Sequence, residues 1–345
     1  MQINLVSDTT TKPTKEMLKV MMNAEVGDDV FKTDPSVNAL EEKVAKMFGK
    51  EAALFFPSGT MANQTAIKVH TQPGEQLIAD KDAHFFNYEG GGVSFNSGVS
   101  CKLLDGNNGR FTADEVMRAI NPPDFYHSPL TSLVCIENTT NRGGGTCWDF
   151  NDIVKIRKVC DENSLGFHLD GARLWNALVA KNETPEQYGR VFDTISVCLS
   201  KGLGCPVGSV LIGSKAFIEK ALRVRKVLGG GMRQVGYLAA AGIYALDYHI
   251  DRLKEDHKKA KEIADVLAKV AYIKDIDPVE TNILIFYLNE DVDIAEFMNA
   301  LHKEGIHIIN MGQGKLRIVT HLDYNDAMHK KVLKILRSLQ VKKRA

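Results

Sequence analysis

The most informative stretch of this 345-residue sequence reads Gly166-Phe167-His168-Leu169-Asp170-Gly171-Ala172-Arg173. A short apolar run ends there in a carboxylate, and a glycine follows the carboxylate. The next apolar run, residues 194–199, ends instead in a cation, within Ser200-Lys201-Gly202. Runs this short and this apolar are typical of strands that are buried on both faces of a parallel sheet.

Strands and helices are predicted to alternate on both sides of this stretch. Further strands are expected at 76–79, 101–104, 132–136 and 209–212, and helices at 37–48, 112–120, 150–163 and, as one long region, 234–268. This alternation indicates an α/β domain with a mostly parallel sheet. The order then changes to strand, helix, strand and helix, at 282–288, 294–303, 316–319 and 327–339. We predict an irregular N-terminal segment (1–30), a large α/β domain (31–250) and a smaller C-terminal α+β domain (251–345).

Composition excludes several classes of protein. Basic and acidic residues number 43 each, so the formal net charge is zero, and 44% of the residues are hydrophobic. These values argue against disorder and against a nucleic-acid partner bound through bulk positive charge. No apolar stretch reaches the ~20 residues that a bilayer requires, and the first residues lack the pattern of a signal peptide. The six cysteines form no C-x-x-C pair, so we expect buried free thiols in a cytoplasmic protein without a membrane partner.

Three predicted strand ends carry residues with distinctive chemistry, and ligands of open α/β sheets bind at such ends. Ser58-Gly59-Thr60 precedes a helical pattern, so its N–H groups and hydroxyls suit an anion such as phosphate, although a plain N-cap is the alternative. Asp170 supplies a carboxylate. Lys201 lies between apolar residues and glycines, and a desolvated lysine amine is a nucleophile suited to Schiff-base chemistry. A lysine that extends to solvent is the alternative.

Taken together, these strand ends match the requirements of pyridoxal phosphate. That cofactor needs a helix N-terminus for its phosphate, a carboxylate for its pyridine nitrogen and a lysine for its aldehyde. His84 is placed to stack on the ring, with an ordinary loop histidine as the alternative. The run Gly90-Gly91-Gly92 after Glu89 is expected in a loop that admits the cofactor or a neighbouring chain, or that is simply flexible. We predict pyridoxal phosphate as the cofactor and no metal.

Many short strings occur along the chain in an order typical of one family. They are Ser7-Asp8-Thr9, Val26-Gly27-Asp28-Asp29-Val30, Pro57-Ser58-Gly59-Thr60, Ile136-Glu137-Asn138-Thr139, Asp170-Gly171-Ala172-Arg173, Leu199-Ser200-Lys201-Gly202, Gly229-Gly230-Gly231-Met232-Arg233-Gln234 and Arg317-Ile318-Val319-Thr320-His321. In these strings the sequence resembles the threonine aldolases, which are fold-type I pyridoxal-phosphate enzymes. The resemblance implies a transferase-like large domain of fold-type I with a small C-terminal domain.

The resemblance also implies roles around the cofactor. Lys201 looks like the Schiff-base lysine, Asp170 like the partner of the pyridine nitrogen, and His84 like the residue stacked on the ring. Ser58, Gly59 and Thr60 resemble the phosphate cradle. Arg233 resembles an arginine that the family lends to the phosphate site of a neighbouring subunit. This implies a homotetramer, or at least a homodimer with a shared active site.

Four residues resemble the family's substrate site. Together, Arg173, Arg317 and Ser7 resemble the family's clamp for the substrate carboxylate. The residue that Arg173 resembles also lies near the cofactor in the family. The planar guanidinium of arginine suits a carboxylate well, although a surface ion pair is the alternative for either arginine. His127 resembles the second active-site histidine, near the substrate hydroxyl. The N-terminal segment 1–30 is therefore expected to contribute to the active site.

Three positions depart from the family's usual residues. Val6 and Leu130 stand where arginine is common, and Thr140 stands where histidine is common. These changes remove two cations and an imidazole. They leave open the preference among threonine, allo-threonine and bulkier β-hydroxy amino acids.

The sequence therefore predicts a carbon–carbon lyase that cleaves threonine or allo-threonine to glycine and acetaldehyde. His84, His127 or a bound water is the candidate base for the β-hydroxyl. Another fold-type I activity on small amino acids, a racemase, β-eliminating lyase or transaminase, is the nearest alternative. A metal-dependent hydrolase with His168 and Asp170 as ligands on one face of a strand is a remote one, and a non-catalytic scaffold of the same fold is a third.

Overall fold

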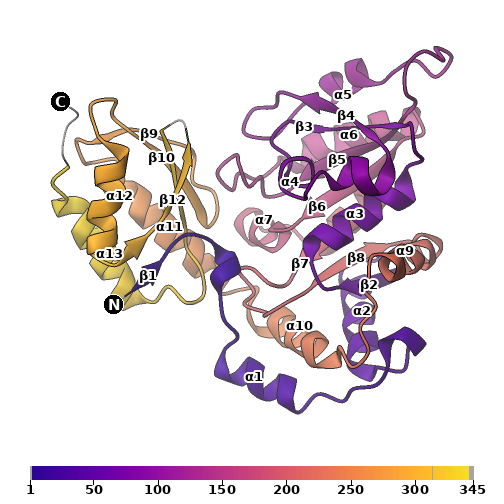
Figure 1. Ribbon diagram of the computed structural model, residues 1–345, viewed down its shortest axis with the longest axis horizontal. Helices are drawn as coiled ribbons and strands as arrows, with labels where there is room; N and C mark the ends of the chain where they lie inside the picture. Colours follow the sequence, from indigo (N-terminus) through magenta and orange to yellow (C-terminus); the bar gives the residue numbers. More distant parts are fainter. Residues whose placement is uncertain (1, 313, 342–345) are drawn as a thin grey trace.

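A seven-stranded sheet forms the centre of the larger of two lobes in the computed structural model, which describes residues 2–312 and 314–341 (Figure 1). In spatial order its strands are β2 (Ala52–Phe56), β8 (Ser209–Gly213), β7 (Thr194–Cys198), β6 (Gly166–Gly171), β5 (Thr131–Glu137), β3 (Gln76–Asp80) and β4 (Ser100–Leu104). Only β8 runs against its neighbours among these strands; the other pairings are parallel. This is the predicted α/β arrangement.

Alternate residues of these strands face two different hydrophobic cores. In β2, Ala53 and Phe55 pack into one core, whereas Leu54 and Phe56 pack into another on the opposite face of the sheet. Such double burial explains why the strands read as continuous apolar runs in the sequence. The helices of this lobe are α1 (Lys15–Met22), α2 (Pro35–Met47), α3 (Gly59–His70), α4 (His84–Asn87), α5 (Ala113–Ala119), α6 (Phe150–Glu162), α7 (Leu174–Lys181), α8 (Pro185–Val191), α9 (Lys215–Val227) and α10 (Gly236–Tyr248), with the π-helical segment η3 (Val93–Ser97) and the 3-10 turns η1 (Asp8–Thr10) and η2 (Asp29–Phe31). Helices α3 and α9 cover one face of the sheet, and α2, α6 and α10 cover the other.

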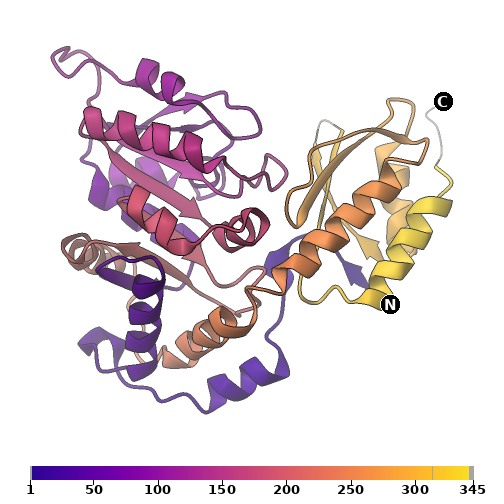
Figure 2. The same cartoon turned by 180° about the vertical axis from the view of Figure 1, so that it is seen from behind.

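The smaller lobe contains a four-stranded antiparallel sheet. Its strands, in spatial order, are β12 (Ile309–Gly312), β13 (Lys315–Val319), β10 (Ile283–Leu288) and β9 (Ile273–Ile276), and its helices are α11 (Leu253–Leu267), α12 (Ile294–Lys303) and α13 (Asp326–Ser338). Figure 2 shows α11, in orange, and α13, in yellow, side by side on this lobe.

The start of the chain belongs to the smaller lobe. Strand β1 (Ile3–Asn4) pairs in parallel with β11 (Ile306–His307), and Ile3 and Leu5 are buried in the core of that lobe. The chain then passes between the lobes before it reaches α1. The larger lobe's main core draws on residues from Met17 to Leu253. The three domain limits themselves stay a prediction.

Two helical regions differ from the sequence-based expectation. The first thirty residues are not irregular throughout, because α1 begins at the N-cap Thr14 and buries Met17 against the larger lobe. The long helical region is two helices, α10 and α11, and the chain turns between them where His249 Nδ1 bonds the carbonyl of Leu203. Helix α5, predicted at 112–120, begins with a capping box of Thr112 and Glu115. Within the described chain, the helices are too short or too polar to cross a membrane.

Candidate functional site

A cavity of about 430 Å³ lies where the carboxyl end of the large sheet meets the smaller lobe. It is lined by Ser7, Thr9, His84, Tyr88, Asn141, Arg142, Arg173, Lys201, Ile309, Asn310, Met311 and Arg317. Five of these residues, Ser7, His84, Arg173, Lys201 and Arg317, were predicted from the sequence to form the site. Four of the lining residues carry arginine or lysine side chains and none is acidic, so the cavity suits an anionic ligand.

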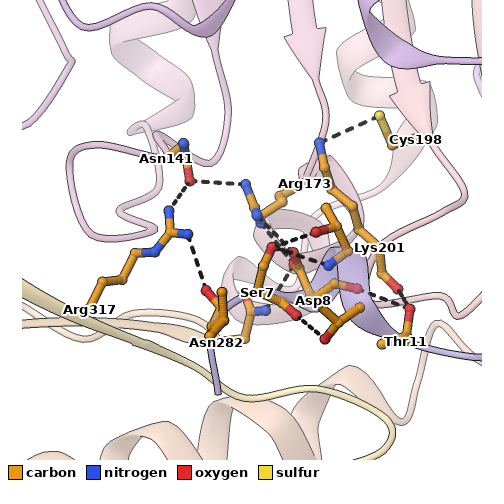
Figure 3. A network of polar contacts seen from close by, with 12 residues as sticks. Ser7, Asp8, Thr11, Asn141, Arg173, Cys198, Lys201, Asn282 and Arg317 are labelled. Carbon is orange, nitrogen blue, oxygen red and sulfur yellow. Dashed lines mark hydrogen bonds and ion pairs between the residues drawn. The ribbon is translucent and has the colours of Figure 1, made fainter. Parts of the chain in front are cut away.

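Lys201 follows β7 and extends its amine into the cavity. The Nζ atom lies 3.6 Å from Sγ of Cys198, at the end of β7, and the Lys201 carbonyl accepts a hydrogen bond of 2.9 Å from Oγ1 of Thr11 (Figure 3). The N-terminal segment thus holds the backbone of Lys201. Its amine has no carboxylate partner within residues 2–312 and 314–341.

Asp170 is buried at the end of β6. Its Oδ2 accepts 2.9 Å from Nδ2 of Asn63 in α3, and its Oδ1 accepts 3.1 Å from the Ala172 N–H. Asn63 is fixed in turn, since its Oδ1 accepts 2.6 Å from Oγ of Ser196. Asp170 also pairs in register with Glu137 of β5, and burial and the neighbouring Asp170 charge raise the pKa of Glu137.

The turn Ser58-Gly59-Thr60 begins α3, the helix that carries Asn63. Ser58 Oγ accepts 3.2 Å from the Met61 N–H, as an ordinary N-cap does. A Cβ atom added at Gly59 would lie 2.8 Å from Sγ of Cys198, so the helix N-terminus packs directly against the strand end next to Lys201. The first N–H groups of a helix have no backbone partner within it. Apart from the N–H of Met61, those at the start of α3 therefore remain available to an anion beside the lysine.

Arg173 and Arg317 approach each other from the two lobes (Figure 3). Arg173 makes a buried bidentate ion pair with Asp8, at 2.8 Å from Nε and 2.7 Å from Nη2. Asn282 Nδ2 also donates to Asp8, at 3.1 Å. Burial alone would raise the pKa of Asp8, but the charge and hydrogen bonds of Arg173 hold that pKa well below its usual range. Both arginines donate from Nη1 to Oδ1 of Asn141, at 3.3 Å and 3.0 Å.

Among the residues that the structure describes, Arg317 is the cation of this pair that makes no ion pair. Its Nη2 donates 3.2 Å to the Val6 carbonyl, and its Nε is buried without a hydrogen-bond partner in the described part of the chain. Burial and the charge of nearby Arg173 lower the pKa of Arg317 to about 10. A carboxylate entering the cavity would relieve both effects.

His84 begins α4 and lies at the wall of the cavity. Its Nδ1 donates 3.1 Å to Oε1 of Glu89, a buried carboxylate on the same segment. This hydrogen bond, opposed by burial and helped by the charge of Asp170, raises the pKa of His84.

Six predicted site residues do not line this cavity. Ser58, Gly59, Thr60 and Asp170 belong to the strand-end contacts described above, whereas Arg233 and His127 do not. The Arg233 side chain is 53% exposed, bonds Asp28 Oδ2 at 2.8 Å and covers the ring of Phe31. His127 is exposed on the loop between α5 and β5 and packs on Tyr126, with ring centroids 4.1 Å apart. A single chain therefore does not bring these two residues to Lys201.

The structure does not favour His168 as a metal ligand. Its Nδ1 bonds Oγ1 of Thr194 at 2.9 Å and its Nε2 bonds Oδ1 of Asn63 at 3.3 Å, so both ring nitrogens already have partners. Burial also lowers the pKa of His168 to about 3. Side-chain atoms of His84, Glu89 and Asp170 lie within 4.8 Å of one another, but oxygens of both carboxylates already accept hydrogen bonds from Asn63.

The three departures from the family pattern have different surroundings. Val6 contacts Arg317 through its backbone carbonyl, so its side chain is not part of that bond. Thr140 is buried and bonds Thr146 Oγ1 at 2.8 Å, and Leu130 is 51% exposed. The cavity lining includes none of the three.

Sequence reasoning assigned no role to Asp8, Asn63, Glu89 and Asn141. Asp8 and Asn141 stand beside residues that were singled out, but their partners lie far away in the sequence. Asn63 and Glu89 gave a weak signal, since each is a polar residue that borders an apolar or glycine-rich run. Burial of such polar groups implies a partner, and only the fold identifies it.

The comparisons with known proteins agree with this geometry. Residues 4–291 match the family model described as "Beta-eliminating lyase". The chain is 41% identical over 331 residues to a probable low-specificity L-threonine aldolase 2 of Arabidopsis thaliana, covering 94% of this chain and 93% of that protein. It is 40% identical over 324 residues to the low specificity L-threonine aldolase of Escherichia coli K12, covering 93% and 94%.

Solved structures show the same fold. The threonine aldolase of Leishmania major superposes with a TM-score of 0.83 at 21% identity, covering 98% of this chain and 99% of that one. At that identity the likeness is one of fold alone. The predicted fold class and the resemblance stated from the sequence are both confirmed.

Proposed function

Because this chain belongs to the beta-eliminating lyase family, we propose that it is a threonine aldolase. It cleaves the Cα–Cβ bond of threonine, allo-threonine or a related β-hydroxy-α-amino acid and releases glycine and an aldehyde. The observation that carries this proposal is the pairing, in one cavity, of the Lys201 amine with Arg317, a buried cation without a counter-ion among the described residues. When the carboxylate of an amino acid binds Arg317, its α-carbon lies on the side of the cavity that holds Lys201.

The residues around Lys201 fit pyridoxal phosphate, which we propose as the cofactor. When bound, it supplies an electron sink for the electrons of the broken bond. Lys201 would hold its aldehyde carbon covalently, Asp170 would face the pyridine nitrogen, and the N-terminus of α3 at 58–60 would hold its phosphate. The fit rests on the packing of Gly59 against Cys198 and on the buried carboxylate of Asp170. His84 would contact the ring from the cavity wall.

The substrate carboxylate binds Arg317 in this proposal. The charge of Arg173 is already balanced by Asp8. Arg173 therefore adds little net charge to the cavity, and its main role is to hold Asn141 in place. Ser7 and Thr9 line the same part of the cavity. The base that takes the β-hydroxyl proton is His84, a bound water or, from a neighbouring chain, His127.

The exposed positions of Arg233 and His127 support an oligomer. We propose a homodimer with shared active sites, or a homotetramer, in which these residues reach the cavity of a neighbouring chain. We also propose a cytoplasmic location, because all six cysteines are free and five of them are buried, as a reducing compartment allows.

The Lys201→Ala variant tests the proposed function. It should keep the far-ultraviolet circular dichroism of the parent protein, lose turnover by at least about 10³-fold, and lose the visible absorbance of the bound cofactor. Lys254→Ala, which removes an exposed lysine of α11, is the matched control and should change neither property. Unchanged turnover in Lys201→Ala would overturn the proposal.

A product assay separates the neighbouring activities. Threonine and allo-threonine should yield acetaldehyde and glycine. Ammonia and a keto acid from serine or threonine would instead indicate β-elimination, and loss of optical activity from alanine would indicate a racemase. A keto acid that forms only when an amino acceptor is added would indicate a transaminase.

A further inference from the structure

Glu89 is a buried carboxylate that lies directly behind His84. Its side chain has no solvent exposure, and its two oxygens accept three hydrogen bonds. Oε1 accepts 3.1 Å from His84 Nδ1 and 3.1 Å from Asn63 Nδ2, and Oε2 accepts 2.7 Å from Gln64 Nε2. A buried carboxylate that accepts this many hydrogen bonds is held in one position.

The glycine run explains why Glu89 can face back toward His84. Gly90 and Gly91 have φ angles of 63° and 71°, the left-handed region that L side chains rarely adopt. At Gly92 a Cβ atom would lie 2.5 Å from Cδ of Gln64, the side chain that holds Glu89 Oε2. The three glycines therefore shape the turn so that Glu89 meets α3 and α4 at once.

Asn63 connects this carboxylate to the cofactor side of the site. Its Nδ2 donates both to Glu89 Oε1 and to Asp170 Oδ2, at 3.1 Å and 2.9 Å. His84, Glu89, Asn63 and Asp170 thus form one chain of hydrogen bonds. One end of the chain is the cavity wall, and the other is the carboxylate proposed to face the pyridine nitrogen.

We propose that Glu89 is a positioning residue for His84. It holds the imidazole in one orientation, with the proton on Nδ1, so that Nε2 is the ring nitrogen presented to the cavity. The orientation of the His84 imidazole follows from the contacts of Glu89. Only the role of Nε2 in the reaction rests on the proposed function.

Several charged groups face His84, and their balance sets the expected titration. Tyr88 and Glu89 lie on its own segment, Asp170 faces it from β6 and Glu137 from β5. Across the cavity are Arg142, Arg173, Lys201 and Arg317. Of these, Glu89 makes the direct hydrogen bond, which is the largest influence raising the pKa of His84.

The first test reads the tautomer of His84 in the full-length, cofactor-loaded protein. Histidines labelled with ¹⁵N give separate signals for protonated and bare ring nitrogens, and the loss of one set in His84→Gln assigns it among the ten histidines. We expect neutral His84 to carry its proton on Nδ1. A proton on Nε2 would overturn the proposal, and this measurement needs no altered Glu89.

The second test replaces the carboxylate by its isosteric amide. Glu89→Gln should lower the midpoint of the His84 titration by about one pH unit, a tenfold loss of proton affinity, and move the acidic limb of the kcat/KM profile by the same amount. The visible absorbance of the cofactor should persist. Asp80→Asn, which removes another buried carboxylate at the end of β3, should leave the His84 midpoint in place.

The outcomes separate the two proposals. An unchanged His84 midpoint in folded Glu89→Gln contradicts the positioning role, whatever the activity. Retained turnover in Lys201→Ala contradicts the proposed function, whereas the His84 tautomer and midpoint are still readable in that variant.

Discussion

Arg173 and Arg317 meet at one asparagine and differ in how their charges are balanced. Both donate to Oδ1 of Asn141, one from the end of β6 and the other from β13. Arg173 shares two hydrogen bonds with the buried Asp8, whereas the described acceptors of Arg317 are two uncharged oxygens. Arg173 fixes the N-terminal segment to the sheet, whereas in the function we propose the charge of Arg317 serves to bind a ligand.

The strongest test of this contrast removes the counter-ion of Arg173. Asp8→Asn leaves a buried guanidinium without its carboxylate, so the free energy of unfolding should fall by about 3–5 kcal/mol. Urea unfolding followed by circular dichroism measures the change. Asp28→Asn breaks the half-exposed pair with Arg233 and should cost less than about 1 kcal/mol. Equal losses in the two variants would contradict the view that Arg173 is held by a buried ion pair.

The same ion pair predicts a sign for the effect of pH. The pKa of Asp8 is lower in the folded protein than in the unfolded chain, so the unfolded chain binds the proton more readily. The stabilisation that the ion pair provides is fully present above the pKa of an aspartate in the unfolded chain, about 3.9. It is lost as the pH falls through the lower pKa of Asp8 in the folded protein. In Asp8→Asn this part of the acid sensitivity should disappear, which acid titration of both proteins can measure.

Removing the unbalanced cation should affect the substrate more than the fold. Arg317→Gln should lower kcat/KM about 10²-fold, mainly through KM, because a charged hydrogen bond to the substrate carboxylate is lost. The unfolding free energy should change by much less than in Asp8→Asn, since no buried anion is left alone. Steady-state kinetics measures kcat and KM, and urea unfolding of the same preparation measures the free energy of unfolding. A KM equal to that of the parent enzyme would assign the substrate carboxylate to another residue.

The sequence alone predicts the strand ends well and the arginines poorly. Asp170 and Lys201 were found because an apolar run and the reactive residue that ends it are adjacent in the chain, so local pattern is enough. The partner of Arg173 is 165 positions away, and no local pattern distinguishes a balanced arginine from an unbalanced one. Both arginines therefore appeared as one clamp.

The same limit applies to the fold. The apolar strands and the capped helix α5 were predicted because they follow from periodicity and caps. Helix α1 was missed, because its burial depends on the packing of Met17 against a part of the larger lobe that is distant in the sequence. Strands β9 and β12 were missed as well. They are partly exposed and therefore lack a continuous apolar run.

A carboxylate placed between the two arginines tests whether Arg317 is free to bind a ligand. Asn141→Asp should raise KM about tenfold, because the new carboxylate binds Arg317 and competes with the substrate carboxylate. It should leave the unfolding free energy equal or slightly higher, since it adds a charge partner to Arg173 and Arg317. Asn141→Ala is the control: it removes the shared acceptor without adding charge, so its KM should rise less. A smaller KM in Asn141→Asp than in Asn141→Ala would contradict a free Arg317.

We expect the smallest effect at Arg233, whose charge is balanced by Asp28 at the protein surface. The ion pair of Arg233 with Asp28 is half-exposed, so Arg233→Ala should change the unfolding free energy by less than about 1 kcal/mol. If Arg233 reaches the phosphate site of a neighbouring chain, the same change should raise the Kd of pyridoxal phosphate about fivefold, because one of several phosphate contacts is lost. Arg223→Ala removes an exposed arginine of α9 and should alter neither quantity. Fluorescence titration of the two variants with the cofactor measures the difference, and equal Kd values would contradict a role of Arg233 at the phosphate site.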